Sequence, residues 1–390
     1  MSQVSEKLAI EGGRPVRTEM LPYARQQIGE RDIDAVVEVL RSDWLTTGPK
    51  VEQFEAALAE IAGTAEAVAV SNGTTALLAA MHALEVGPGD EVIVPAITFA
   101  ASANCVAWFG ATPIPADVET GSLLLDPDGV QAEITSNSKA IIAVDYAGNV
   151  CDYDRLNSIA EKHGLAIVDD ASHCLGGSRR GRPVGSLARL STFSFHPVKH
   201  VAGGEGGAVT TDDAGLANRM RRFRDHGRDA SSGCMVELGL NGRMSDIHCA
   251  LAISQLSQLQ RSISRRREIA AYYDRAFAEM PEIDTLTVEP DVSHARHLYV
   301  VAFDLEKLRA DRDRVLNALR SEGIGATVHY MPFHLQDYYR KRFGTSEGDC
   351  PVAEQAGKRI LSLPMFPGMS DGDVEDVIAA VHKVIEAYRR

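Results

Sequence analysis

The sequence predicts an α/β fold with a mostly parallel sheet in a large domain and a smaller α/β domain after it. Short apolar runs typical of buried strands alternate with segments of helical length, an order that favours a parallel sheet covered by helices on both faces. Glycine and proline stand at the junctions, as in GPGD at 87–90. The expected strands cover 67–71, 91–95, 139–144 and 166–169, and the expected helices cover about 74–86, 101–109 and 153–163.

The chain changes character after about residue 255. An arginine-rich helical stretch over 257–277 leads into the strand HLYVVAFD, a helix closed by glycine at 311–323, and an amphipathic C-terminal helix. We therefore predict three parts, an N-terminal arm over 1–34, a large domain over 35–255 and a small C-terminal domain over 256–390.

The composition argues against several classes of partner. With 54 acidic against 40 basic residues the formal charge is −14, so we expect no binding to nucleic acid. No apolar run approaches the roughly 18 residues that span a bilayer, and the N-terminus lacks a signal peptide, so we expect a cytoplasmic protein without a membrane partner. The six cysteines form no CxxC pair. We interpret them as reduced core residues and expect no metal site.

Two motifs at strand ends are ambiguous taken alone. In SNGTTAL at 71–77, a helix that begins near Gly73 and Thr74 can bind a phosphate, but such turns are often simple helix caps. In IVDDASHCLGG, Asp169 and Asp170 end an apolar strand. Because side chains alternate along a strand, one of them must face the interior, where a protonated ring nitrogen of a cofactor would pair with Asp170. A helix cap formed by Asp169 or by Ser172 explains this motif equally well.

The third motif, STFSFHPVKHVAGGEGGAVTT, contains Lys199 between an expected strand and a glycine-rich turn. This is a poor place for a solvated surface charge, although a surface loop lysine is the alternative. A lysine in a desolvated site has a lowered pKa and attacks an aldehyde as the neutral amine.

These segments resemble the DegT/DnrJ/EryC1/StrS family of sugar aminotransferases, a branch of the fold-type I transferases that depend on pyridoxal 5′-phosphate (PLP) and share the aspartate aminotransferase-like fold. The resemblance runs over nearly the whole chain and in order. Besides the three motifs above, it includes LPYARQQIGERDIDAVVEVL, SDWLTTGPKVEQFE, VPAITFAASAN, LNGRMSDIHCALAISQL and VHYMPFHLQDYY.

The resemblance implies a role for each matching residue. Lys199 would hold PLP as a Schiff base and then move the proton between substrate and cofactor. Asp170 would pair with the pyridine nitrogen, and His173 would lie near the phenolic oxygen. The remaining matches are Gly73, Thr74 and Ser194 in a phosphate cup, Phe99 stacked on the ring, and Asn241, which reaches the phosphate of the neighbouring subunit's cofactor. A homodimer with shared active sites is therefore expected.

Several segments are most similar to the subgroup that aminates C4 of UDP-linked 4-keto-6-deoxy-N-acetylhexosamines on the pseudaminic-acid route. The resemblance implies L-glutamate as amino donor, with L-glutamine as the alternative, and a GDP- or dTDP-linked keto sugar as the alternative substrate. Candidates for contact with the nucleotide sugar are Arg25, Thr47, His329 and Tyr330.

Two other functions are possible on the same scaffold. A PLP-dependent sugar 3-dehydratase resembles this chain but has histidine in place of the lysine, and here the lysine is present, with His200 beside it rather than replacing it. A non-catalytic regulator would be expected to lose Asp170 or Lys199, and this chain keeps both. The residues therefore favour the aminotransferase.

Overall fold

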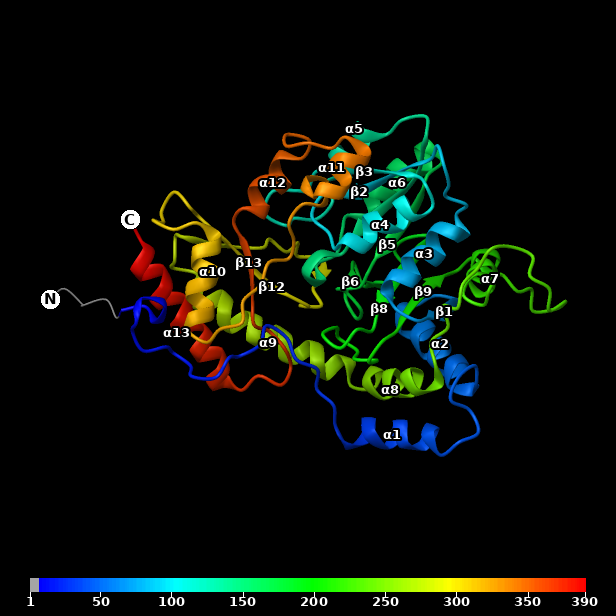
Figure 1. Cartoon of the computed structure of the whole chain (residues 1–390), viewed down its shortest axis with the longest axis horizontal. Helices are drawn as coiled ribbons and strands as arrows, with labels where there is room; N and C mark the ends of the chain where they lie inside the picture. The colour runs from blue at the N-terminus through cyan, green and yellow to red at the C-terminus, as the bar shows by residue number, and fades with distance from the viewer. Residues whose placement is uncertain (1–6) are drawn as a thin grey trace.

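A seven-stranded sheet forms the centre of the larger part of the molecule (Figure 1). The structure, a computed structural model, describes residues 7–390. The strand order is β1-β9-β8-β5-β4-β2-β3, and only β9 runs against the other six. The mostly parallel sheet is thus confirmed. The bounds are β1 Glu66–Val70, β2 Glu91–Pro95, β3 Thr112–Ala116, β4 Ser138–Val144, β5 Ala166–Asp170, β8 Leu190–Ser194 and β9 Gly207–Thr211.

Helices cover both faces of this sheet. Neighbouring residues of a strand face opposite sides, and both sides of these strands carry apolar side chains that must be buried. Ile141 and Ile167 pack in one core with α2, α5, α6 and α8, whereas Ile142 and Val168 pack in another core with α3, α4 and α7. The helix bounds are α2 Pro49–Ala62, α3 Gly73–Ala83, α4 Ala100–Trp108, α5 Pro127–Glu133, α6 Tyr153–His163, α7 Ala214–Phe223 and α8 Asp246–Leu256.

Local sequence signals set where these helices begin and end. Pro49 occupies the first turn of α2, and Gly63 ends the helix with a φ of 69°, a conformation that glycine adopts without steric cost. The Asp152 side chain caps α6 by accepting from the Arg155 N–H.

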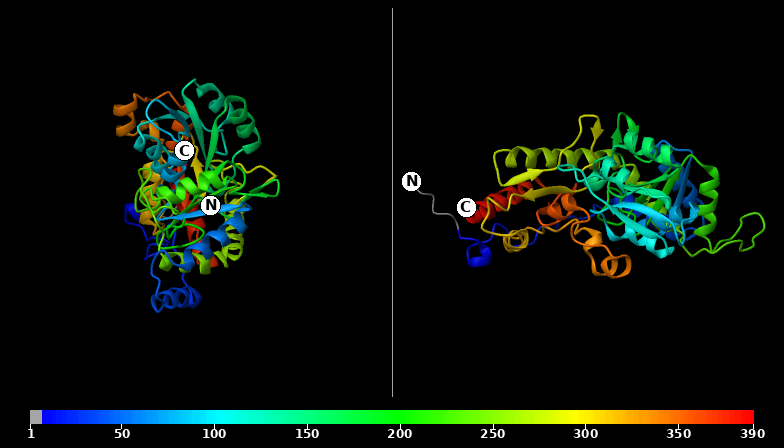
Figure 2. Two further views of the ribbon diagram at one scale, coloured as in Figure 1. Left: turned by 90° about the vertical axis from the view of Figure 1, so that its right-hand side faces the viewer. Right: turned by 90° about the horizontal axis from the view of Figure 1, so that it is seen from above.

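The smaller part of the molecule has its own sheet and its own apolar core. Its strands lie in the order β10-β12-β13, and α9, α10 and α13 pack around them (Figures 1 and 2). The bounds are α9 Leu259–Phe277, β10 Ile283–Thr285, β12 Tyr299–Phe303, α10 Arg312–Ser321, β13 Ile360–Leu363 and α13 Asp371–Tyr388. Two short helices, α11 Asp337–Phe343 and α12 Pro351–Gly357, lie between α10 and β13 in the chain. A small third sheet contains β6 Ser178–Arg179, β7 Arg182–Pro183 and β11 Val292–Ser293.

The N-terminal segment connects the two parts. It packs first on the smaller part, where Ala9 and Val16 donate their N–H groups to the Glu322 carboxylate at 2.8 and 3.0 Å. It then crosses to α1 (Glu30–Leu40), which lies along α8. The expected end of the arm at residue 34 falls inside α1, because this helix continues as one unit. The first six residues of the arm lie outside the described residues, and the division into domains stays a prediction.

One expectation about the cysteines needs correction. All six are free and five are buried, but Cys234 is exposed in the loop that follows α7, because this loop projects away from the sheets and their cores. Within residues 7–390, no helix is both long and apolar enough to cross a membrane, and no group of three or more potential ligands could hold a metal ion.

Candidate active site

A cavity of about 530 Å³ opens where the parallel strands end. Strands β4, β5 and β8 contribute Val144, Asp170 and Ser194, their last residues, to its wall. Ligands of open α/β sheets bind at this edge. The cavity brings together nine of the residues predicted from the sequence, namely Gly73, Thr74, Phe99, Asp170, His173, Ser194, Lys199, His329 and Tyr330.

Lys199 lies in the turn that follows β8. The backbone N–H of Lys199 donates to the His196 carbonyl at 2.8 Å, and this hydrogen bond closes the turn. Burial lowers the pKa of Lys199 to about 8, although the charge of Asp170 acts in the opposite direction. A larger fraction of this amine is therefore neutral at pH 7 than for an exposed lysine.

This pKa predicts how the cofactor-free protein takes up PLP. At pH 7 roughly 10% of an amine with a pKa of about 8 is neutral, against roughly 0.03% at the ordinary 10.5. The rate of covalent uptake, followed by absorbance, should rise with pH and level off above a midpoint near 8. A rate that keeps rising beyond pH 10 would contradict the buried position of Lys199. In Asp170→Asn the midpoint should move to lower pH, because the carboxylate that raises the lysine pKa is gone.

The two adjacent aspartates of β5 face opposite sides of the sheet. Asp170 lines the cavity, where its Oδ2 accepts from the Ser102 hydroxyl at 2.7 Å. Asp169 is fully buried, and neither of its carboxylate oxygens has a hydrogen-bond partner within residues 7–390. Burial and the nearby Asp145 raise the pKa of Asp169 well above its ordinary value. Of the pair, only Asp170 is placed to meet a ligand in the cavity.

The start of α3 forms a narrow polar corner of the cavity. The Asn72 side chain caps the helix by accepting from the Thr75 N–H at 2.8 Å, which leaves the N–H groups of Gly73 and Thr74 for a ligand. A Cβ on Gly73 would lie 2.8 Å from the Ser194 Cβ, so only glycine fits here. Backbone N–H groups at a helix start, with a serine hydroxyl beside them, suit a phosphate group.

Aromatic and imidazole rings also line the cavity. The Tyr330 hydroxyl lies 3.3 Å from Nε2 of His173, whose ring centroid is 4.5 Å from that of His297. Burial, followed by the charge of Lys199, lowers the pKa of His173 well below its ordinary value, so its imidazole is neutral at pH 7. Phe99 is 56% exposed and its ring centroid is 5.9 Å from that of Tyr330, which leaves a ring face free for stacking.

These residues fit PLP group by group. The α3 corner suits its phosphate, Phe99 offers a ring face, and Asp170 is a carboxylate for its pyridine nitrogen. Lys199, with its lowered pKa, can hold its aldehyde. The sequence profile of the DegT/DnrJ/EryC1/StrS aminotransferase family matches residues 26–382. The chain belongs to this family.

Individual relatives agree with the family assignment. The spore coat polysaccharide biosynthesis protein SpsC of Bacillus subtilis (strain 168) is 41% identical over 382 residues, which cover 95% of this chain and 98% of SpsC. The PLP form of Spr1654 from Streptococcus pneumoniae, a putative sugar aminotransferase, superposes with a TM-score of 0.89 at 33% identity, covering 94% of this chain and 99% of that one.

A third relative is PseC of Helicobacter pylori, an aminotransferase involved in the biosynthesis of pseudaminic acid. It superposes with a TM-score of 0.90 at 31% identity, covering 95% of this chain and all of PseC. The fold-type I architecture and PLP as the cofactor are thereby confirmed for this DegT-family enzyme. When bound, PLP acts as an electron sink for the carbanion formed during amino transfer.

Three predicted residues lie away from the cofactor cavity. Arg25 is exposed and lines a second cavity, and Thr47 is exposed and lines a third. Asn241 is exposed and pairs through its backbone with Asp225. Within residues 7–390 of a single chain, Arg25 shares only the second cavity with Lys199, and Thr47 and Asn241 line no cavity that contains Lys199. The roles predicted for Thr47 and Asn241 would therefore require a second copy of the chain.

The cavity also contains residues that the sequence did not reveal. Tyr23 comes from the N-terminal segment, His297 from the loop just before β12, and Glu205 from the glycine-rich turn. Ser102, the hydrogen-bond donor to Asp170, stands in the family segment VPAITFAASAN. A buried carboxylate needs a hydrogen-bond donor, and this requirement could have identified Ser102 from the sequence. Tyr23 stands in the family segment LPYARQQIGERDIDAVVEVL, whereas His297 lies outside the segments that carry the resemblance, and no local signal marks it as a site residue.

Proposed function

We propose that this enzyme transfers an amino group from L-glutamate to the keto group of a nucleotide-linked keto-deoxy sugar. The observation that carries the proposal is that Lys199 lies in one cavity with Asp170, so that both the amine and the acid of a transaminase are available. The dehydratase relatives lack this lysine. The substrate we propose is a UDP-linked 4-keto-6-deoxy-N-acetylhexosamine, aminated at C4, and the names of SpsC and PseC support a sugar of this kind.

In this proposal the chain's own residues divide the work. Lys199 moves the proton between the amino-bearing carbon and the cofactor, and its lowered pKa suits an acid and base near neutral pH. Asp170 holds a proton on the ring nitrogen, while Gly73, Thr74 and Ser194 bind the phosphate. His173, neutral at pH 7, would lie near the phenolic oxygen of the cofactor, and the Tyr330 hydroxyl, 3.3 Å from its Nε2, would orient it.

The substrate is tested with a panel of UDP-, GDP- and dTDP-linked keto sugars, each with L-glutamate or L-glutamine as donor. We expect turnover to be highest with the UDP-linked 4-keto sugar and L-glutamate, with the new amine at C4 identified by NMR. If only a GDP- or dTDP-linked sugar is aminated, the proposed UDP-linked substrate is wrong and the enzyme belongs to another subgroup of the family. No amination of any sugar would contradict the proposal.

We further propose a homodimer in which Asn241 completes the phosphate site of the partner subunit. The loop that follows α7 supports this, because it projects from the molecule (Figure 2). Its side chains Met235, Val236 and Leu238 are 66%, 58% and 87% exposed. Exposed apolar groups of this kind mark protein interfaces. The loop is followed directly by Asn241.

Mixing two inactive chains tests the shared site. A heterodimer of a Lys199→Ala chain and an Asn241→Asp chain has both defects in one composite site and none in the other. It should recover about half of the dimer's activity, whereas each parent homodimer is inactive. If verified heterodimers regain nothing while Asn241→Asp alone is inactive, Asn241 acts within its own subunit.

A further inference from the structure

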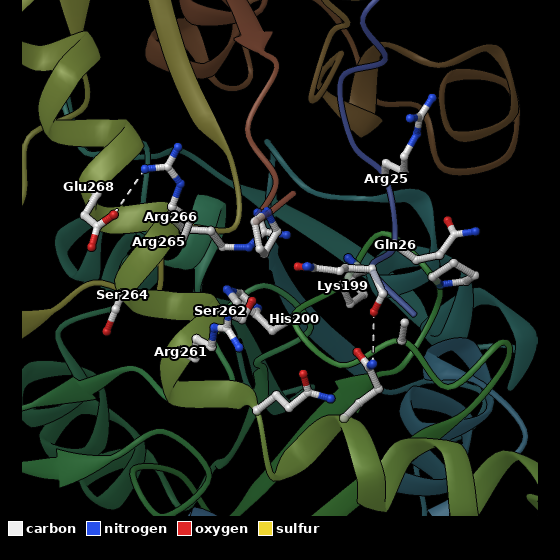
Figure 3. Close-up of a pocket in the computed structure, with 16 residues that line it drawn as sticks. Arg25, Gln26, Lys199, His200, Arg261, Ser262, Ser264, Arg265, Arg266 and Glu268 are labelled. Atoms are coloured by element: carbon white, nitrogen blue, oxygen red, sulfur yellow. Dashed lines mark hydrogen bonds and ion pairs between the residues drawn. The ribbon is translucent and has the colours of Figure 1, made fainter. Parts of the chain in front are cut away.

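A second cavity, of about 410 Å³, shares Lys199 with the cofactor cavity, and Figure 3 shows the residues that line it. It lies between the first half of α9, the segment 25–27 and the turn after β8, and Lys199 is the one described residue that lines both cavities. We propose that this second cavity binds an anionic group of a substrate whose reacting end is held at Lys199. This inference rests on the proposed function, because the anionic group belongs to one of the two proposed substrates, the amino donor or the nucleotide sugar.

The charge of the second cavity is opposite to that of the whole chain. The chain has a formal charge of −14, but α9 contributes Arg261, Arg265 and Arg266 to this wall. Arg265 is already engaged with Glu268 at 3.2 Å and with Asp371 at 2.7 Å. In Figure 3 Arg25 extends away from Lys199, so it has no part in the proposal. Arg261 and Arg266 therefore remain as the cations that could bind an anion in this cavity.

Arg266 is a buried charge without an acidic partner. It is 2% exposed, its Nη1 donates to the carbonyls of His297 and Met365 at 3.1 and 2.9 Å, and its Nε has no hydrogen-bond partner within residues 7–390. No carboxylate of residues 7–390 forms an ion pair with it, and burial alone lowers its pKa to about 10. A buried charge of this kind is costly unless an opposite charge compensates it, and an anion in the cavity would do so.

Arg261 is the second free cation at the cavity. It is exposed on α9, and among residues 7–390 it makes no ion pair or side-chain hydrogen bond. Planar guanidinium groups bind carboxylates and phosphates through paired hydrogen bonds. The volume falls within the range of small-ligand sites. The cavity therefore fits either a carboxylate of the amino donor or the diphosphate of the nucleotide sugar.

Two non-reacting probes distinguish these sources by calorimetric titration of the holoenzyme. UDP represents the diphosphate and glutarate represents the dicarboxylate of the donor. Arg261→Gln removes a charge without disturbing a structural contact, unlike a change of the buried Arg266. The matched control is Arg275→Gln, on the same helix, where the guanidinium lies 4.8 Å from the centroid of the Tyr272 ring and does not line the cavity.

At least one probe should bind roughly 10- to 100-fold more weakly to Arg261→Gln, as expected for loss of a charged hydrogen bond, while the control stays within about twofold of the unchanged enzyme. Weaker UDP binding assigns the cavity to the diphosphate, and weaker glutarate binding assigns it to the donor. The inference is overturned if neither probe binds the unchanged holoenzyme, or if both variants bind alike.

This experiment separates the subsite from the proposed function. If keto sugars are aminated but probe binding does not depend on Arg261, the subsite alone is wrong. If probe binding depends on Arg261 but no keto sugar is aminated, the cavity still binds anions and the proposed function alone is wrong.

Discussion

Replacing Lys199 with alanine is expected to remove the absorbance band of lysine-bound PLP and to lower turnover by at least roughly 10³-fold, since the variant loses both the covalent attachment and the proton-transferring amine. The fold should be kept, because the backbone hydrogen bond from Lys199 to His196 does not depend on the side chain, and that side chain faces a cavity. Spectra and steady-state rates of the purified variant check both effects.

Lys162→Ala is the matched control for this change. Lys162 is exposed on α6 and lines neither the cofactor cavity nor the second cavity, so its loss should leave spectrum and rate unchanged. A Lys199→Ala protein with the full absorbance band and near-normal turnover would show that another lysine holds the cofactor.

The second large effect is expected for Asp170→Asn, which should still bind PLP but lose turnover by roughly 10²- to 10⁴-fold, or about 3 to 5 kcal/mol in barrier. A neutral amide does not favour the protonated ring nitrogen on which carbanion stabilisation depends. Ser102 can hydrogen-bond to either side chain, so the local packing should survive. Single-turnover rates with L-glutamate measure the effect on the chemical step.

Asp169→Asn is the natural control, because it is the same substitution one residue away on the opposite face of the sheet. The raised pKa of Asp169 favours its uncharged form, whose shape asparagine closely resembles, so turnover should stay within about tenfold of the unchanged enzyme. If Asp169→Asn is inactive while Asp170→Asn retains near-normal rates, the two carboxylates have been assigned the wrong way round.

The parallel strands and the residues at their ends could be predicted because each carries a local signal. Apolar runs marked β1, β2, β4 and β5, and the polar residues that follow them had to meet at one edge. The reversed direction of β9 was not predicted. The sequence does contain a signal for this direction. Residues 195–206, which connect β8 to β9, are rich in glycine and contain no helix. A connection between parallel strands commonly contains a helix.

The rest of the site depends on long-range packing that no local pattern encodes. Tyr23 and His297 reach the cavity from parts of the chain that lie far apart in sequence, because the N-terminal segment and the smaller part of the molecule pack beside Lys199. Arg266 stands in an arginine-rich run that reads as a solvated helix face, yet it is buried. Only the packing of α9 between the two parts makes it a candidate ligand-binding residue.

The most direct test of the central claim is to reduce the holoenzyme with borohydride and map the modified peptide by mass spectrometry. Reduction fixes PLP on the lysine that holds it. We expect a single stoichiometric adduct on Lys199, within the peptide that follows β8, and none in Lys199→Ala. A stoichiometric adduct on any other lysine, or an unmodified Lys199 in a yellow and active enzyme, would show that Lys199 does not hold the cofactor.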